Sequence, residues 1–183
     1  MTDEREDALR DALEAAHEGA EDGPGAGADD RKRSTFLVTA ADADSAVLKD
    51  AEDGQVHTLS SNPGVEVDDA VTGVVAPEPP MNVTWQLIEV EHRWPLSIDL
   101  SDESPTRTSI EAADGRNVGE LDRRERAGEG EIHVITVPED EEAESAREVT
   151  EDREATLSRA ARLGVNRVEV RYGDGVVSVR YVP

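Results

Sequence analysis

Short apolar runs, most of them rich in valine, recur along residues 34–104 at a spacing of about ten residues. TFLVT, SAVLK and QVHTL are separated by the turn-forming segments AADAD and DAEDG, and VEVDDAVTGVVA follows the loop SSNPG. Regular short strands of this kind predict a small antiparallel β-barrel of the OB or SH3 type. Such barrels fill their interior with valine and leucine and need few aromatic residues.

The longest strand is predicted in the stretch PEPPMNVTWQLIEVEHRW, which contains both tryptophans. Its apolar positions alternate but change face between Leu87 and Ile88, which predicts a bulge or a sharp bend. Pro95 stands where a ladder N–H is needed, so it marks an edge or a break. We therefore expect Trp85 in the barrel core, and Trp94 either at the junction with the next domain or exposed.

The pattern changes after this strand. Ser104 as N-cap and Pro105 in the first turn predict a short helix. The strand EIHVITV (131–137), a helical segment between Pro138 and Gly164, and the hairpin VNRVEVRYGDGVVSVRYV predict a βαββ unit. The helical segment is acidic in its first half and basic in its second, as the helix dipole favours, and its apolar stripe has a break near Thr150.

The predicted fold class is therefore α+β, in three parts. Residues 1–33 form a disordered acidic arm and linker, because their apolar stripe is too thin to fold alone and runs into a Gly/Ala/Asp-rich segment. Residues 34–104 form the small β-barrel, and residues 105–183 form the α/β (βαββ) unit.

Composition indicates the environment more clearly than the activity. The chain has 43 acidic and 19 basic residues, a formal net charge of −24, and only two lysines. This bias is typical of a halophilic cytoplasm, where concentrated salt screens the repulsion between carboxylates. The absence of cysteine excludes disulfides, thiol catalysis and cysteine zinc sites. No window approaches a membrane-spanning apolar segment, so we expect a cytoplasmic protein with no membrane contact.

No pattern in the sequence points to catalysis, a metal or a cofactor. There is no phosphate-binding loop, nucleophile elbow or dinucleotide fingerprint, and DADSA (42–46) lacks the glycine and later ligands of a calcium loop. The histidines have no metal-binding spacing and are expected as separate surface or rim residues. They are His17, His57, His92 and His133. We therefore expect a protein that is not an enzyme.

Positive charge is distributed unevenly. Residues 34–104 contain 14 acidic and two basic residues, so the barrel lacks the cations that neutralise phosphates. Arg167, Arg171 and Arg180 are predicted on one face of the C-terminal hairpin, where they either bind a partner or pair across strands with Glu169. The segment DRRERAGEGE (122–131), with three arginines, is predicted to be a salt-bridged surface turn, with an anion-binding site as the alternative.

The chain resembles a haloarchaeal family that carries only a domain-of-unknown-function label. The resembling segments include TFLVTAADADSAVLKDAEDGQVHTLSSNPG, ERAGEGEIHVITVPE and AARLGVNRVEVRYGDGVVSVRYVP, and they cover roughly residues 34–183. The resemblance implies a halophilic protein, and it transfers no activity or site residue to this chain. Separately, GVEVDDAVTGVVA is similar to a rhythm found in OB-like and related RNA-binding barrels, which reflects the steric requirement of a strand entering a barrel.

These observations predict a non-catalytic binding or adaptor module, with RNA or a ribonucleoprotein contacted through Arg167, Arg171 and Arg180. The alternative is a protein–protein scaffold or homodimer that uses exposed aromatic surface, for which Trp94 is the candidate. An unidentified enzyme is the third reading. No motif for reading DNA sequence is present.

Overall fold

The computed structural model describes residues 30–183, so most of the predicted arm lies outside the described residues. The arm was predicted to extend to residue 33, but the first strand begins at Lys32. Lys32 and Arg33 are paired with Val75 and Val74 of a neighbouring strand, and this pairing makes them part of the sheet. Residues 32–183 form one compact unit.

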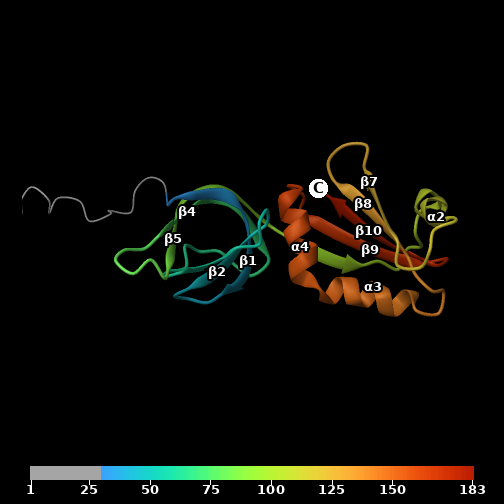
Figure 1. Ribbon diagram of the computed structural model, residues 1–183, viewed down its shortest axis with the longest axis horizontal. Coiled ribbons are helices and arrows are strands. Elements are labelled where there is room, and N and C mark those ends of the chain that lie inside the picture. Colours follow the sequence, from blue (N-terminus) through green and yellow to red (C-terminus); the bar gives the residue numbers. More distant parts are fainter. Residues whose placement is uncertain (1–29) are drawn as a thin grey trace, which may run out of the picture. The chain divides into compact units, whose positions relative to one another are not determined.

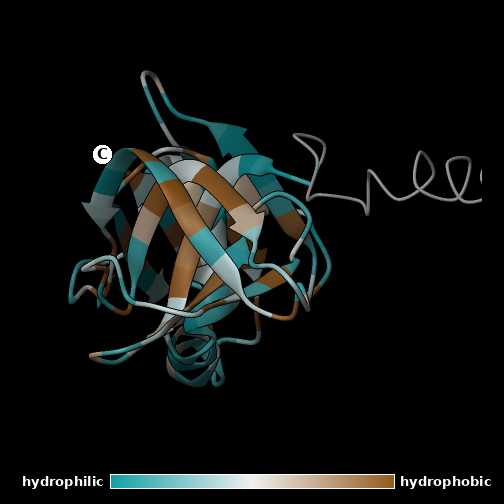
Figure 2. Cartoon of the chain, turned by 90° about the vertical axis from the view of Figure 1, so that its left-hand side faces the viewer, coloured by the Kyte–Doolittle hydropathy of each residue, from teal (hydrophilic) through white to brown (hydrophobic). Residues whose placement is uncertain are grey.

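Five strands close the predicted barrel, in the order β1-β2-β3-β5-β4 (Figure 1). They are β1 (Lys32–Ala41), β2 (Ala46–Asp50), β3 (Val56–Leu59), β4 (Asp69–Pro77) and β5 (Trp85–Pro95). Neighbouring strands are antiparallel except for β3 and β5, which meet in parallel at Leu59 and Trp85. Figure 2 shows apolar and polar positions alternating along the strands. The inward positions form a core that includes Phe36, Val38, Leu48, Leu59, Val71 and Val75.

The bend predicted in β5 is confirmed. Val75 pairs with Leu87 and Val74 with Glu89, so Ile88 is left over as a bulge, at the position where the apolar pattern changes face. Trp85 packs against the barrel core, as expected. After Pro95 the chain leaves the barrel, because proline cannot donate the next ladder hydrogen bond.

The second sheet has the order β6-β9-β10-β8-β7. Its strands are β6 (Ser97–Leu100), β7 (Leu121–Glu125), β8 (Glu131–Thr136), β9 (Arg167–Gly173) and β10 (Val176–Val182). The predicted βαββ unit is present as β8, two helices, β9 and β10. The sequence did not predict β6 and β7 in this sheet. β6 pairs in parallel with β9, so the change of sheet falls at Leu96 and not at residue 104.

The helices cover the two faces of this sheet (Figure 1). They are α2 (Arg107–Ala113), α3 (Glu142–Glu151) and α4 (Arg153–Arg162). The N-cap of α2 is Thr106, whose hydroxyl accepts from the Ser109 N–H at 3.3 Å, and not Ser104 as predicted. The predicted break in the long helix is confirmed at Asp152, whose carboxylate caps α4 by accepting from the Ala155 N–H.

A second core joins the barrel to this sheet. Leu37 and Ala70 of the barrel belong to the same buried cluster as Leu157 of α4 and Val168 and Val177 of the sheet. Each buried leucine or valine stabilises the fold by roughly 1.5–3 kcal/mol. None of the helices in residues 30–183 has the length and apolar character needed to cross a membrane.

Asp50 holds the turn after β2 and anchors the start of β1. One oxygen of its buried carboxylate accepts from the Ser34 hydroxyl and the Glu52 N–H, while the other lies 2.7 Å from Lys32 Nζ. Burial alone would raise the pKa of Asp50, but the hydrogen bond from Lys32 and those from Glu52 and Ser34 outweigh it and lower the pKa. The carboxylate is therefore charged in the folded protein.

We expect Asp50→Asn to lower the free energy of unfolding by about 1.5 kcal/mol, because an amide cannot replace the charge-assisted bonds to Lys32 and the backbone. Urea denaturation at neutral pH measures the change. The difference between wild type and variant should shrink as the pH falls below the ordinary aspartate pKa, and it should disappear once the pH has fallen through the lowered pKa of the folded carboxyl. The exposed neighbour Glu52 is the control, and Glu52→Gln is expected to change little.

Candidate anion-binding groove

One face of the second sheet is only partly covered. α3 and α4 pack against β9, β6 and β10, whereas β8 and β7 extend beyond them. Leu121 and Arg123 of β7 pair with Ile135 and His133 of β8, so these four side chains share that face. The result is a groove, floored by β7 and β8 and walled by α3 and α4.

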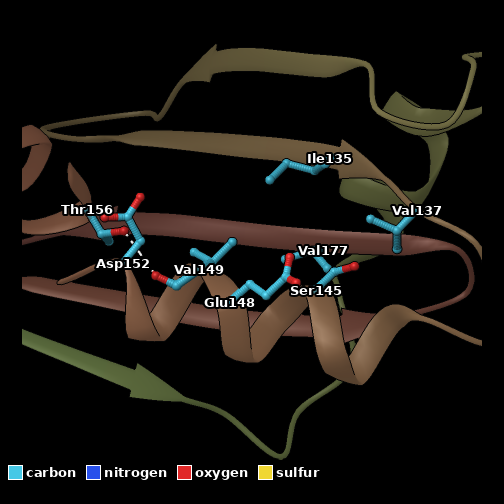
Figure 3. A pocket seen from close by; sticks show the side chains of 8 residues that line it. All are labelled: Ile135, Val137, Ser145, Glu148, Val149, Asp152, Thr156 and Val177. Atoms are coloured by element: carbon cyan, nitrogen blue, oxygen red, sulfur yellow. Dashed lines mark hydrogen bonds between the residues drawn. The ribbon is translucent and has the colours of Figure 1, made fainter. Parts of the chain in front are cut away.

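Two adjoining hollows make up the groove and share Ile135, Asp152 and Thr156. The first is apolar in its floor and has a volume of about 340 Å³ (Figure 3). Ile135 approaches it from β8 and Val137 from the residue that follows this strand, while Ser145 and Val149 approach it from α3. Thr156 closes the helix wall by donating its hydroxyl to the Val149 carbonyl at 3.1 Å.

The second hollow, of about 550 Å³, is cationic. It is lined by Arg123 from β7, Arg159 and Arg162 from α4, and His133 and Tyr181 from the sheet. The two helix arginines are three residues apart, which places them on the same side of α4. The preference for arginine near a helix C-terminus therefore also supplies two charges to the groove.

Only one of the three arginines is neutralised within the described residues. Arg159 forms a bidentate ion pair with Glu131, in which Nη2 lies 2.6 Å from Oε1 and Nε lies 3.2 Å from Oε2. Arg123 and Arg162 form no ion pair with any residue in the range 30–183. Two guanidinium groups thus remain available at one end of the groove, in a chain whose net charge is −24.

The neighbouring titratable groups are held in defined states. Arg159 lowers the pKa of Glu131 by donating hydrogen bonds to it. Burial lowers the pKa of His133, against the opposing effect of Glu131, and burial raises the pKa of Tyr181 to about 12. At neutral pH the hollow therefore contains charged arginines and a protonated phenol, which are donors suited to a carboxylate or phosphate, beside a neutral imidazole whose Nε2 lies 2.9 Å from Glu131.

The arginines selected from the sequence lie on the other face of the sheet. Arg171 and Arg180 each contact Glu169 at 2.8 Å, and Arg171 also lies 2.6 Å from Glu103. Their side chains are only 12% and 19% exposed. The sequence left two alternatives open for these arginines, binding of a partner or pairing with Glu169, and the structure shows the pairing of Arg171 and Arg180 with Glu169. Arg167 is exposed at the start of β9.

Trp94 lies at the junction and not on an open surface. It is partly buried against the core that joins barrel and sheet, and its indole N–H donates to the Val165 carbonyl at 3.1 Å. His92 stacks on it with ring centroids 4.9 Å apart. The polar atom of this candidate partner-binding residue is therefore already used within the fold.

The three histidines in the described residues do not form a common site. His57 is fully buried in the barrel, which differs from the surface or rim position expected, whereas His92 is exposed and His133 lies in the groove. His17 lies outside the described residues. Within residues 30–183 no group of three or more metal-binding side chains comes together.

Residues 122–125 of the segment DRRERAGEGE form the end of β7 where a turn was predicted, and only residues 126–130 form a loop; the predicted salt bridges are present. Asp122 pairs with Arg124 at 2.7 Å and with Arg116 at 3.1 Å. Strand alternation turns Arg123 away from this cluster and into the groove. Sequence reasoning missed the groove because β7 was not recognised as a strand; the alternation of Leu121 and Arg123 with Asp122 and Arg124 was the available signal.

The match to a known protein family covers both the barrel and most of the second sheet. Residues 32–172 match the family of unknown function DUF5812. The chain belongs to this family. The DUF5812 match begins at Lys32, the first residue of β1, and extends into β9. No curated protein and no solved structure matches the chain.

Proposed function

We propose that this DUF5812 protein is a non-catalytic binding module that takes an acidic ligand in the groove between β7–β8 and α3–α4. The observation that carries the proposal is the pair of arginines without internal partners, Arg123 on the β7 floor and Arg162 on the α4 wall of one hollow. Most other cations in the described part of the chain are in ion pairs, as with Arg171 and Arg180 around Glu169. Exceptions such as Arg126, Arg147 and Arg167 do not line the hollow.

The groove suits a ligand with one or two anionic groups better than a polynucleotide. A nucleic acid strand binds by neutralising several successive phosphates, which takes a track of cations. Here two unpaired arginines stand next to an apolar hollow, and the acidic Glu148 and Asp152 lie along the same wall. The binding surface proposed from the sequence, with RNA contacted through Arg167, Arg171 and Arg180, is therefore replaced in the proposal by the groove.

The chemistry of the groove favours binding over catalysis. His133 places its Nε2 2.9 Å from Glu131, so it is engaged by a carboxylate that also holds Arg159. Its burial keeps it neutral, and the Thr156 hydroxyl is committed to the Val149 carbonyl. A nucleophile needs an adjacent base to be activated, and these contacts do not supply one.

The test uses two labelled probes, hexaglutamate and an oligouridylate, with binding followed by fluorescence anisotropy over a series of KCl concentrations. We expect the protein to bind hexaglutamate, and the double variant Arg123→Gln/Arg162→Gln to bind it at least about tenfold more weakly, because charge-assisted hydrogen bonds are lost. The salt series also tests the proposed halophilic character, since a halophilic fold should keep the groove intact at high KCl.

The matched control is Arg107→Gln/Arg147→Gln, which removes the same charge from exposed positions outside the groove. It should leave hexaglutamate binding within about twofold of wild type, since distant surface charges are largely screened. If both double variants lost the same hexaglutamate affinity, the peptide would be attracted by the overall charge, and the proposed binding in the groove would be contradicted. Preferential binding of the oligouridylate would instead favour an RNA partner.

A further inference from the structure

The edge of the second sheet beside the groove has unused hydrogen-bonding groups. β7 is the last strand of the sheet, and within residues 32–183 only β8 pairs with it. Thr136 donates its N–H to the Glu120 carbonyl, and Arg126 donates to the Gly130 carbonyl. These two bonds fix which residues of β7 face β8, because hydrogen-bonded pairs alternate along an antiparallel ladder.

The alternation leaves three residues facing outward. Glu120 and Arg126 are in hydrogen-bonded pairs, and so are Asp122 and Arg124 between them. The backbone N–H and C=O groups of Leu121, Arg123 and Glu125 therefore point away from β8. Leu121 and Arg123 also project their side chains into the groove, so the open backbone edge and the anion-binding hollow belong to the same residues.

We propose that the ligand of the groove is an extended peptide segment of a partner protein, which adds to β7 as a sixth antiparallel strand. This inference rests on the proposed function and names the class of partner. An added strand would gain main-chain hydrogen bonds from the three outward residues, while its alternate side chains would meet the side chains of β7 on the groove face.

The side chains of β7 define the sequence of the segment. Directly opposed residues on neighbouring strands share a face, and opposite charges or apolar pairs stabilise them. The residue of the segment opposite Glu125 is therefore basic, the one opposite Arg123 is acidic, and the one opposite Leu121 is apolar. Because the segment runs antiparallel to β7, its sequence from the N-terminus is a basic residue, any residue, an acidic residue, any residue and an apolar residue. Its acidic side chain lies at the cationic hollow beside Arg162, and its apolar side chain lies towards Ile135.

The charges on β7 also restrict what can add to this edge. Charged residues on edge strands normally prevent indiscriminate pairing between sheets. Four consecutive charged residues, Asp122 to Glu125, have this effect on any uncharged or wrongly charged strand. Asp122 and Arg124 form an ion pair with each other on the opposite face of the sheet. Arg123 and Glu125 are therefore the charged residues that select the partner.

The experiment uses the full chain and a labelled peptide with the core Lys-Thr-Glu-Thr-Val. We expect it to bind about tenfold more tightly than the core Glu-Thr-Lys-Thr-Val, which has the same composition with the charges exchanged. N-methylation at the central glutamate, whose N–H faces β7, should weaken binding about tenfold, whereas N-methylation at the following threonine should have little effect. Amide exchange at Leu121, Arg123 and Glu125 should slow in the complex.

The outcomes separate this inference from the function on which it rests. Equal binding of both peptides, or equal effects of the two N-methyl groups, overturns strand addition; if hexaglutamate still needs Arg123 and Arg162, the anion-binding groove stands. Failure of hexaglutamate and of both peptides overturns both. Slower amide exchange on β7 with increasing protein concentration and no peptide would show self-pairing of two copies in place of a partner peptide, and would also overturn the inference.

Discussion

Gly73→Ala is expected to lower the free energy of unfolding by about 3 kcal/mol, one of the largest losses from a single added methyl group in this protein. Gly73 lies in β4 where β5 bends across it. A Cβ atom there would lie 2.1 Å from the Glu89 carbonyl oxygen and 3.3 Å from a methyl group of Leu87. The nearest obstacle is backbone, so it cannot rotate away as a flexible side chain does.

The loss would be concentrated in the barrel. β4 pairs with both β1 and β5, and the two register shifts between β4 and β5 lie on either side of Gly73. Separating the strands at this point would expose the buried neighbours Val71 and Val75. Urea denaturation followed by tryptophan fluorescence measures the effect, because Trp85 packs against this core.

Gly64→Ala is the matched control for Gly73→Ala. Gly64 has a φ of +93° and no atom within 4 Å of an added Cβ, so alanine there introduces backbone strain without a steric clash. We expect a loss of about 1 kcal/mol. If Gly73→Ala were as stable as Gly64→Ala, the close approach of β4 and β5 would be contradicted.

The second large effect is expected on acidification, and it depends on His57. The ring is fully buried between Phe36 and Trp85, with ring centroids at 5.6 and 4.4 Å, and neither nitrogen has a hydrogen-bond partner in the described residues. Burial lowers the pKa of His57, and the Lys32 charge lowers it further, against Asp50 and Asp53. The imidazole is therefore neutral in the folded barrel.

The sign of the pH dependence follows from this lowered pKa. The unfolded chain binds a proton at His57 near pH 6.5, but the folded barrel does so only at a lower pH. Stability is therefore complete above the unfolded pKa and is lost as the pH falls through the folded pKa, with a slope of up to about 1.4 kcal/mol per pH unit. We expect the free energy of unfolding to fall between pH 7 and pH 5 because of this residue.

His57→Leu should remove this part of the pH dependence. It should be at least as stable as wild type at pH 7, because it replaces a buried polar ring that lacks partners. His133, whose pKa is also lowered by burial, will keep a smaller slope in the variant. Urea denaturation at several pH values measures the difference, with the exposed His92→Leu as control. Parallel pH curves for wild type and His57→Leu would contradict the prediction.

Several features of the fold are encoded in short stretches of sequence. The change of apolar face at Ile88 predicted the bulge in β5, and Asp152 interrupts the long helix close to the predicted break. The glycine in the segment VEVDDAVTGVVA, Gly73, occupies a position that excludes a side chain. These features were predictable because alternation, proline, glycine and helix caps act on neighbouring residues along the chain.

The candidate site depends on contacts that no local pattern contains. Arg171 and Arg180 were correctly placed on one strand face, but whether they are free or paired depends on Glu169 and on Glu103, which lies far away in sequence. Likewise Arg123 joins Arg159 and Arg162 only because α4 stops short of β7. The family match names no activity, so it does not supply these contacts either.

The sequence by itself determined the strand and helix periodicities, the bend in β5, the βαββ unit and the excess of negative charge. Only the tertiary structure decided the sheet that β6 joins, the burial of His57, the place of Trp94 at the junction, and which arginines stay unpaired. The physical reason is the range of the interactions. Periodicity states which way a side chain points, whereas burial and ion pairing depend on what the folded chain brings opposite to it.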